Sequence, residues 1–151
     1  MEIRKADMDM ADEIRRVLQI TIQTVYPRYY PKEVVDFFCR HHSLEHVLNC
    51  IQTGNMRVVM EGERILGVGA LDGNHITGLY VLPECQGTGC GTRLMEALEK
   101  EISRICRTAV LEASLPGMML YEHRGYRTIG HGMLNLEHEI CLVYEIMEKE
   151  L

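Results

Sequence analysis

The chain has 151 residues, 46% of them hydrophobic and 25% charged, and its formal net charge is −6 at pH 7. This length predicts one domain, residues 1–151, with enough apolar side chains for a core, while the acidic balance argues against a nucleic-acid partner. No apolar run is long enough to cross a bilayer, and the N-terminus lacks the apolar segment of a signal peptide. We therefore expect a cytoplasmic protein without a membrane partner.

The first 25 residues predict a short strand and an amphipathic helix. Residues 2–5 alternate in polarity as a short strand does, and Asp7 or Asp9 suits the N-cap of the helix that follows. Positions of the expected buried face then recur three or four residues apart: Ala11, Ile14, Val17, Leu18, Thr21 and Val25. This spacing is typical of a helix that packs one face on a core.

Residues 26–54 predict two more helices. Prolines interrupt the first helix, since proline cannot donate a backbone hydrogen bond, and Pro31 suits the first position of a second helix. Ser43 suits the N-cap of a third helix, which Gly54 ends.

The rest of the chain predicts strands joined by turns, with two helices between them. The expected strands are 56–60, 65–71, 75–82, 108–114, 127–136 and 140–147. The expected helices are 88–105 and 116–123. The first of these connects two strands as a parallel β-α-β unit, for which a right-handed crossover is the default. The pattern therefore predicts an α/β fold with a mixed, mostly antiparallel central sheet.

A glycine-rich loop joins the strand that ends at Pro83 to the helix expected at 88–105. The expected buried face of this helix carries Gly91, Leu94, Met95, Leu98, Ile102 and Ile105. First-turn N–H groups lack helical partners and glycines let a phosphate approach the backbone, so the loop predicts an anion site. Gly91 is followed by Thr-Arg instead of Lys-Ser/Thr, which excludes a Walker loop, and the glycine spacing does not fit the dinucleotide fingerprint.

Two segments carry a resemblance to a known family. Gln86, Gly89 and Gly91 form the pattern Gln-x-x-Gly-x-Gly directly after a strand, which resembles the acetyl-CoA loop of the GNAT superfamily, the GCN5-related N-acetyltransferases. The segment 120–126, Leu-Tyr-Glu-His-Arg-Gly-Tyr, resembles the Phe-Tyr-Glu-Lys-x-Gly-Phe segment of the same family. The family's order of elements (strand, two helices, three strands, helix, strand, helix, two strands) matches the expected order, with one extra helix before Gly54.

The resemblance implies a function. A GNAT-like enzyme moves the acetyl group of acetyl-CoA to a primary amine of a small molecule or peptide, by direct attack within a ternary complex. It implies acetyl-CoA as co-substrate, no metal, and a possible homodimer. The alternative is a non-catalytic GNAT-like module that binds acyl-CoA or a protein partner, although such a module has no need of the motif's tyrosine at Tyr121.

The resemblance also implies which residues meet the cofactor. Backbone groups of the central strand would pair with the pantetheine arm, the glycine-rich loop would hold the pyrophosphate, and Ser114 would hydrogen-bond the arm. The full set is Leu79, Tyr80, Val81, Gln86, Gly87, Thr88, Gly89, Cys90, Gly91, Thr92, Ser114 and Tyr121. An N–H group near Leu79 would stabilise the oxyanion that forms on the thioester carbonyl. The alternative is that the glycines only form a tight turn.

Three residues are candidates for proton transfer. Tyr121 is the expected general acid, since a phenol can protonate the departing CoA thiolate; its alternative is packing alone. His75 occupies the position of a family glutamate that serves as general base, eleven residues before Gln86, and histidine is a reasonable replacement. Glu112 is the second candidate for the base. Either residue can equally be an ordinary strand residue at the surface.

Residues 26–50 contain two further clusters. Cys39, His42, His46 and Cys50 have helical spacing, but Ser43 interrupts the helix and no Cys-x-x-Cys is present, so we expect no zinc site. A group of aromatic residues lies in the segment that lines the acceptor pocket of relatives: Tyr26, Tyr29, Tyr30, Phe37 and Phe38. These residues either bind the acceptor or pack in the core. The six cysteines are scattered, so we expect reduced thiols.

Overall fold

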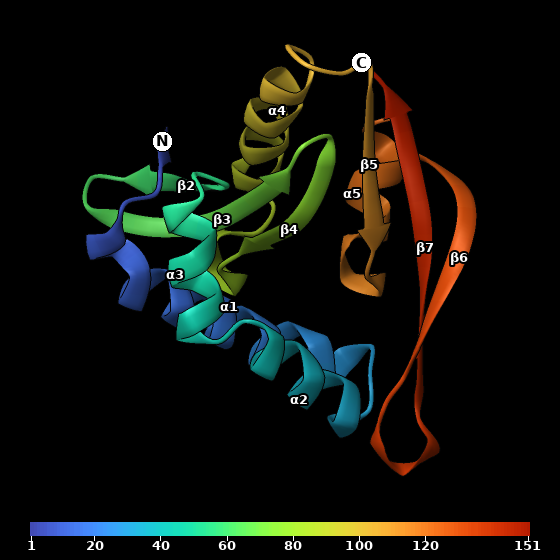
Figure 1. Cartoon of the computed structure of the whole chain (residues 1–151). Coiled ribbons are helices and arrows are strands. Elements are labelled where there is room, and N and C mark those ends of the chain that lie inside the picture. The colour runs from blue at the N-terminus through green and yellow to red at the C-terminus, as the bar shows by residue number, and fades with distance from the viewer.

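One seven-stranded sheet runs through the computed structural model, which describes all residues from 1 to 151 (Figure 1). Its strand order is β1-β2-β3-β4-β5-β7-β6. Neighbouring strands are antiparallel except for β4 and β5, which are parallel. The strands are β1 (Glu2–Lys5), β2 (Met56–Glu61), β3 (Arg64–Asp72), β4 (His75–Val81), β5 (Thr108–Ala113), β6 (Arg127–Asn135) and β7 (Cys141–Glu150).

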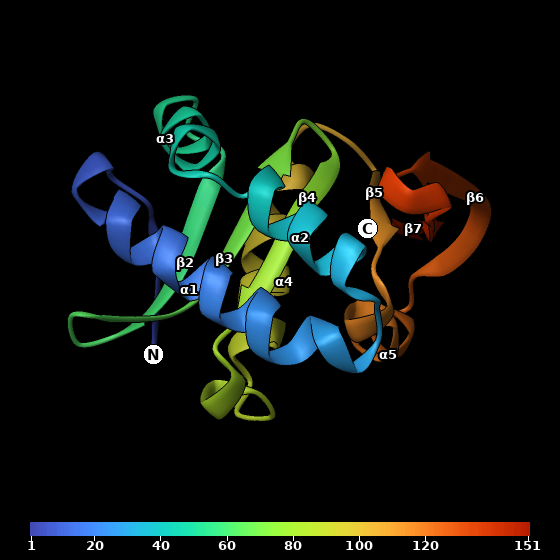
Figure 2. The same cartoon turned by 90° about the horizontal axis from the view of Figure 1, so that it is seen from below.

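Helices cover both faces of this sheet. Figure 2 shows α1 (Ala11–Val25) and α2 (Lys32–His41) in front of the central strands and α4 (Cys90–Ile102) behind them. The helix α3 (Leu44–Gln52) packs with α1, while α5 (Met118–His123) contributes Tyr121 to the same apolar cluster as the α4 residues. Ser43 caps α3 by accepting a hydrogen bond from the His46 N–H, as the sequence predicts.

The core consists of two apolar clusters. The larger cluster joins α1 and the start of α4 to β2, β3 and β4, and the smaller one joins the rest of α4 and α5 to β5 and β7. Two glycines of β3 let α4 pack closely on the sheet. A Cβ atom on Gly67 would lie 3.2 Å from Leu94 Cδ1, and one on Gly69 would lie 3.1 Å from Leu98 Cδ1.

The parallel strands β4 and β5 pair over two positions and then separate. Their register aligns His75 with Val110 and Ile76 with Leu111, with no pairing beyond. The paired end is fixed by Asn74, whose carbonyl accepts the Val110 N–H at 3.0 Å and whose Nδ2 donates to the Thr108 carbonyl at 3.0 Å. The sheet is therefore open between the C-terminal ends of these two strands.

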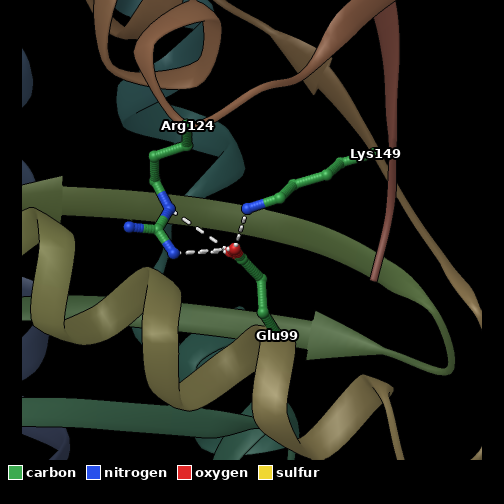
Figure 3. A network of polar contacts seen from close by, with 3 residues as sticks. All are labelled: Glu99, Arg124 and Lys149. Atoms are coloured by element: carbon green, nitrogen blue, oxygen red, sulfur yellow. Dashed lines mark hydrogen bonds and ion pairs between the residues drawn. The ribbon is translucent and has the colours of Figure 1, made fainter.

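A buried ion cluster ties the two halves of the sheet together (Figure 3). Glu99 of α4, whose side chain is 8% exposed, accepts hydrogen bonds from Arg124 at 2.7 and 2.8 Å and from the Lys149 ammonium at 3.0 Å. Arg124 directly follows α5, and Lys149 lies in β7. The cluster thus fixes the end of α5 against α4 and the last strand.

The predicted fold is confirmed, with shifts at the ends of elements. The helix expected at 88–105 begins at Cys90 and ends at Ile102, so the expected inward position of Ile105 is wrong: this side chain is 73% exposed. Pro31 is the N-cap of α2 instead of its first residue. The last strand continues to Glu150, three residues beyond its expected end.

Candidate active site

A cleft of about 330 Å³ opens where β4 and β5 separate. Residues from four parts of the chain line it: the end of β4, the glycine-rich loop, the end of α1 with the turn that follows, and residues 114–121. Ten of the twelve cofactor residues expected from the sequence lie in this lining: Leu79, Tyr80, Val81, Gln86, Gly87, Gly89, Gly91, Thr92, Ser114 and Tyr121.

The backbone of β4 offers unpaired polar groups to this cleft. The Leu82 N–H donates to the Leu66 carbonyl on β3, and antiparallel bonding alternates, so Tyr80 also bonds toward β3. The N–H and carbonyl groups of Leu79 and Val81 therefore point toward β5, which has already separated. The Val81 carbonyl accepts hydrogen bonds from Thr21 Oγ1 and Gln86 Nε2, and so it is already occupied.

The glycine-rich loop brings backbone amides to one end of the cleft. Gly87 and Gly89 have φ angles of +75° and +93°, values that favour glycine, and Gly89 is the N-cap of α4. A Cβ atom on either glycine would meet nothing within 4 Å, so the space above the loop is open. The first turn of α4 has no acidic residue. These features together suit an anion.

Two residues of the expected set do not line the cleft with their side chains. The Thr88 hydroxyl donates to the Cys85 carbonyl and closes the loop on itself. Cys90 is 1% exposed, and its Sγ contacts Met1 Sδ and the Thr88 hydroxyl. Their part in the site is to shape the loop.

Tyr121 lies in the wall of the cleft. Its side chain is 7% exposed, and its ring lies against Gly117. Burial, with smaller contributions from Tyr26 and Tyr126, raises the pKa of Tyr121 above its ordinary value. The phenol therefore carries its proton at neutral pH. Leu120, the first residue of the segment 120–126, also lines the cleft.

A second wall is formed by hydroxyl groups and aromatic rings. Tyr26 stacks on Tyr80 with ring centroids 6.1 Å apart, and the Tyr26 and Ser114 hydroxyl oxygens lie 3.4 Å from each other. Behind Tyr80 lies His42, whose Nε2 is 2.8 Å from the Tyr80 hydroxyl. Burial raises the pKa of both tyrosines. Burial, followed by His41 and His46, lowers the pKa of His42 to about 3, so this imidazole is neutral.

The two candidate bases contact each other at the paired end of β4 and β5. His75 Nε2 lies 2.5 Å from Glu112 Oε2, and both side chains are partly exposed. Neither residue lines the cleft. Ile76 and Leu111 pack in the cluster with α4, so the alternation of strands places His75 and Glu112 on the opposite face, the face of α1 and α2.

Sequence reasoning missed several residues of the cleft, among them Thr21, Arg28 and Gly117. Thr21 was expected only as a helix-packing residue. Arg28 and Gly117 belong to short turns without a motif, and only the arrangement of distant segments brings them here. Of the aromatic group, Tyr26 and Tyr29 line the cleft, while Tyr30 and Phe38 pack on the Tyr26 ring.

No group of three or more His, Cys, Asp or Glu side chains is arranged to hold a metal ion. None of the helices combines the length and the apolar character that crossing a membrane requires.

Comparison with known proteins agrees with this geometry. The family profile of the acetyltransferase (GNAT) domain matches residues 25–145. The chain belongs to the GNAT acetyltransferase family. A search of curated proteins found no match.

Solved structures of this family share the fold. A GCN5-related N-acetyltransferase from Rhodopseudomonas palustris superposes with a TM-score of 0.90 at 21% identity, covering 99% of this chain and 95% of that one. The PaiA N-acetyltransferase from Thermoplasma acidophilum, in complex with coenzyme A, gives 0.78 at 19% identity, covering 99% and 98%. YncA, a putative acetyltransferase from Salmonella typhimurium with its cofactor acetyl-CoA, gives 0.69 at 16% identity, covering 100% and 94%.

Proposed function

We propose that the chain is an N-acetyltransferase that moves the acetyl group of acetyl-CoA to a primary amine of a small molecule or peptide. The observation that carries this proposal is the unpaired edge of β4, which runs along a cleft and leads to the amide groups of the α4 N-terminus. Membership of the acetyltransferase family supports it. So do the structurally similar proteins that hold coenzyme A or acetyl-CoA.

The cofactor would bind along this edge as an added strand. The pantetheine arm would pair with the free N–H and carbonyl of Leu79 and the N–H of Val81. Its pyrophosphate would rest on the amides from Gln86 to Thr92, where two glycines leave the space open. Ser114, at the end of β5, would donate or accept one hydrogen bond from the other side. An N–H of β4 would also stabilise the oxyanion of the tetrahedral intermediate.

Tyr121 would act as the general acid. The amine nitrogen attacks the thioester carbon, the carbon–sulfur bond breaks, and the CoA thiolate leaves. Burial raises the pKa of Tyr121, so the phenol holds its proton until the thiolate forms beside it. Tyr121 belongs to the cleft wall, which supports this role, and its hydroxyl would give its proton to the departing sulfur.

The base that removes the amine proton would be the His75–Glu112 pair, acting through water. The two side chains contact each other, and the carboxylate would stabilise the imidazolium that forms. Because neither residue lines the cleft, a water chain would have to connect them to the amine. We therefore propose the pair as the final proton acceptor, not as a group in contact with the amine.

A thiol-release assay tests the proposed function. The protein is mixed with acetyl-CoA and one of four amines: spermidine, glucosamine 6-phosphate, lysine or a peptide with an N-terminal alanine. We expect release of free CoA with at least one amine above the rate without amine. Tight binding of acetyl-CoA without amine-dependent release would contradict the enzyme and favour the non-catalytic alternative.

A further inference from the structure

The contact between His42 and Tyr80 lies behind the cleft wall and has no part in the chemistry described so far. His42 is 6% exposed and follows the last residue of α2. Its backbone carbonyl accepts a hydrogen bond from Gln19 Nε2 at 3.0 Å, so α1 holds it in place. Its ring meets the Tyr80 ring edge to face, with centroids 4.9 Å apart. The imidazole is thus fixed in position relative to the phenol.

The direction of the hydrogen bond between these two residues depends on the tautomer of His42. Both groups are buried away from water, and burial keeps the imidazole neutral and the phenol protonated. A neutral imidazole nitrogen without a proton can accept a hydrogen bond from a hydroxyl group, and His42 Nε2 lies 2.8 Å from the Tyr80 hydroxyl oxygen. In the tautomer that carries its proton on Nδ1, His42 Nε2 would accept the one proton of the Tyr80 hydroxyl. The remaining lone pairs of the Tyr80 oxygen can then only accept hydrogen bonds.

Tyr80 is the residue through which this bond reaches the cleft. Tyr80 is one of the residues that line the cleft. It also lines a second cavity of about 20 Å³, together with His42 and His46. We propose that His42 is a positioning residue for the acceptor amine: it holds the Tyr80 proton away from the cleft, so that the Tyr80 oxygen accepts an N–H of the amine and fixes the direction of its lone pair.

This inference rests on the proposed function and adds a selection rule to it. An amine that attacks a thioester keeps an N–H group that needs a partner while its lone pair points at the carbon. An oxygen that can only accept hydrogen bonds suits such an N–H group. It disfavours a substrate that presents a lone pair instead of an N–H at this point. The gain is one of orientation, which is a recognised source of rate enhancement.

The kinetic test uses four variants of the full chain: Tyr80→Phe, His42→Leu, the two combined, and His42→Gln. The probe is the amine of the panel above with the highest kcat/KM. We expect Tyr80→Phe and His42→Leu each to lower kcat/KM for the amine about tenfold, the usual worth of one hydrogen bond, with KM for acetyl-CoA within about twofold. The combined variant should be no worse than either one, and His42→Gln, which can still accept a proton, should recover part of the loss.

Two results would overturn the proposal: losses that multiply in the combined variant, or equal effects on the amine and on acetyl-CoA. A second measurement needs no amine at all. Nitrogen NMR of the histidine-labelled protein should find His42 neutral with its proton on Nδ1, and a proton on Nε2 would overturn the proposal even if every amine of the panel fails. Failure of the whole panel together with an unprotonated Nε2 would count against the proposed function while supporting the hydrogen-bond direction.

Discussion

The ring of Tyr121 lies so close to Gly117 that a Cβ atom on Gly117 would stand 2.7 Å from its Cε2 atom. Gly117 therefore sets the place of the proposed general acid. Gly117→Ala should push the ring aside and lower kcat about tenfold or more, since small misplacements of reacting groups are costly. Gly130→Ala is a fitting control: its Cβ would meet only Ile146 Cδ1, at 3.8 Å, far from the cleft. Equal turnover in both variants would contradict this role of Gly117.

The hydroxyl of Tyr121 can be tested against that of a neighbouring tyrosine. Tyr121→Phe should lower kcat about a hundredfold, the lower range for loss of a general acid, while acetyl-CoA affinity stays within a few fold. Tyr126→Phe is the matched control, because its ring lies 6.0 Å from that of Tyr121 and its buried hydroxyl has no partner. We expect full activity from this control. If Tyr121→Phe also retains full turnover, Tyr121 is not the acid.

The buried histidine makes stability depend on pH. The pKa of His42 is about 3 in the folded chain and about 6.5 in the unfolded one. Between these values the unfolded state binds more protons, so stability is complete above about pH 6.5 and falls as the pH decreases. At pH 5 the loss from this residue should be about 2 kcal/mol.

Urea unfolding at about pH 7.5 and about pH 5 measures this loss. His42→Gln cannot take up the proton, so its free energy of unfolding should fall less between the two pH values than that of the unchanged chain. The carboxylates titrate alike in both proteins and cancel in the comparison. An identical fall in both proteins would show that His42 is not the titrating group.

The ion cluster of Figure 3 should contribute strongly to stability. Glu99→Gln leaves Arg124 and Lys149 without their shared carboxylate in a largely buried place, and we expect a loss of about 3–5 kcal/mol in the free energy of unfolding. Glu101→Gln is the comparison. It removes the ion pair with Arg57, where the carboxylate is 31% exposed, and should cost less. A larger loss from Glu101→Gln would contradict this ranking.

The sequence predicted what depends on neighbours in the chain and little of what depends on distant contacts. The Gln86–Gly91 loop was predictable because its strand, glycines and helix are consecutive. The pairing of His42 with Tyr80 and of Tyr26 with Ser114 joins residues 38 and 88 positions apart, and no local pattern indicates it. Ile105 was misplaced because helical spacing continues past Ile102, whereas the helix ends there.

The candidate base shows the same limit in another form. Counting along the chain placed His75 at the family's position for a glutamate, but the contact with Glu112 depends on the register of two parallel strands. That register follows from Asn74 and from packing against α4, neither of which the count includes. The contact between the two side chains supports the proposed role of the pair. Only the structure shows that neither residue lines the cleft.

The most direct measurement of the central claim is the melting temperature with and without saturating acetyl-CoA, for the unchanged chain and for Gly89→Glu. A ligand at about a hundred times its Kd adds about 2.7 kcal/mol to the folded state, so we expect a clear rise with acetyl-CoA and with CoA but not with ATP. Gly89→Glu should lose this rise, because it places charge and bulk where the pyrophosphate would lie. Gly62→Glu, at a turn glycine with φ +60° and open space around it, should keep the rise. No rise in the unchanged chain, or a full rise in Gly89→Glu, would contradict the cofactor site proposed here.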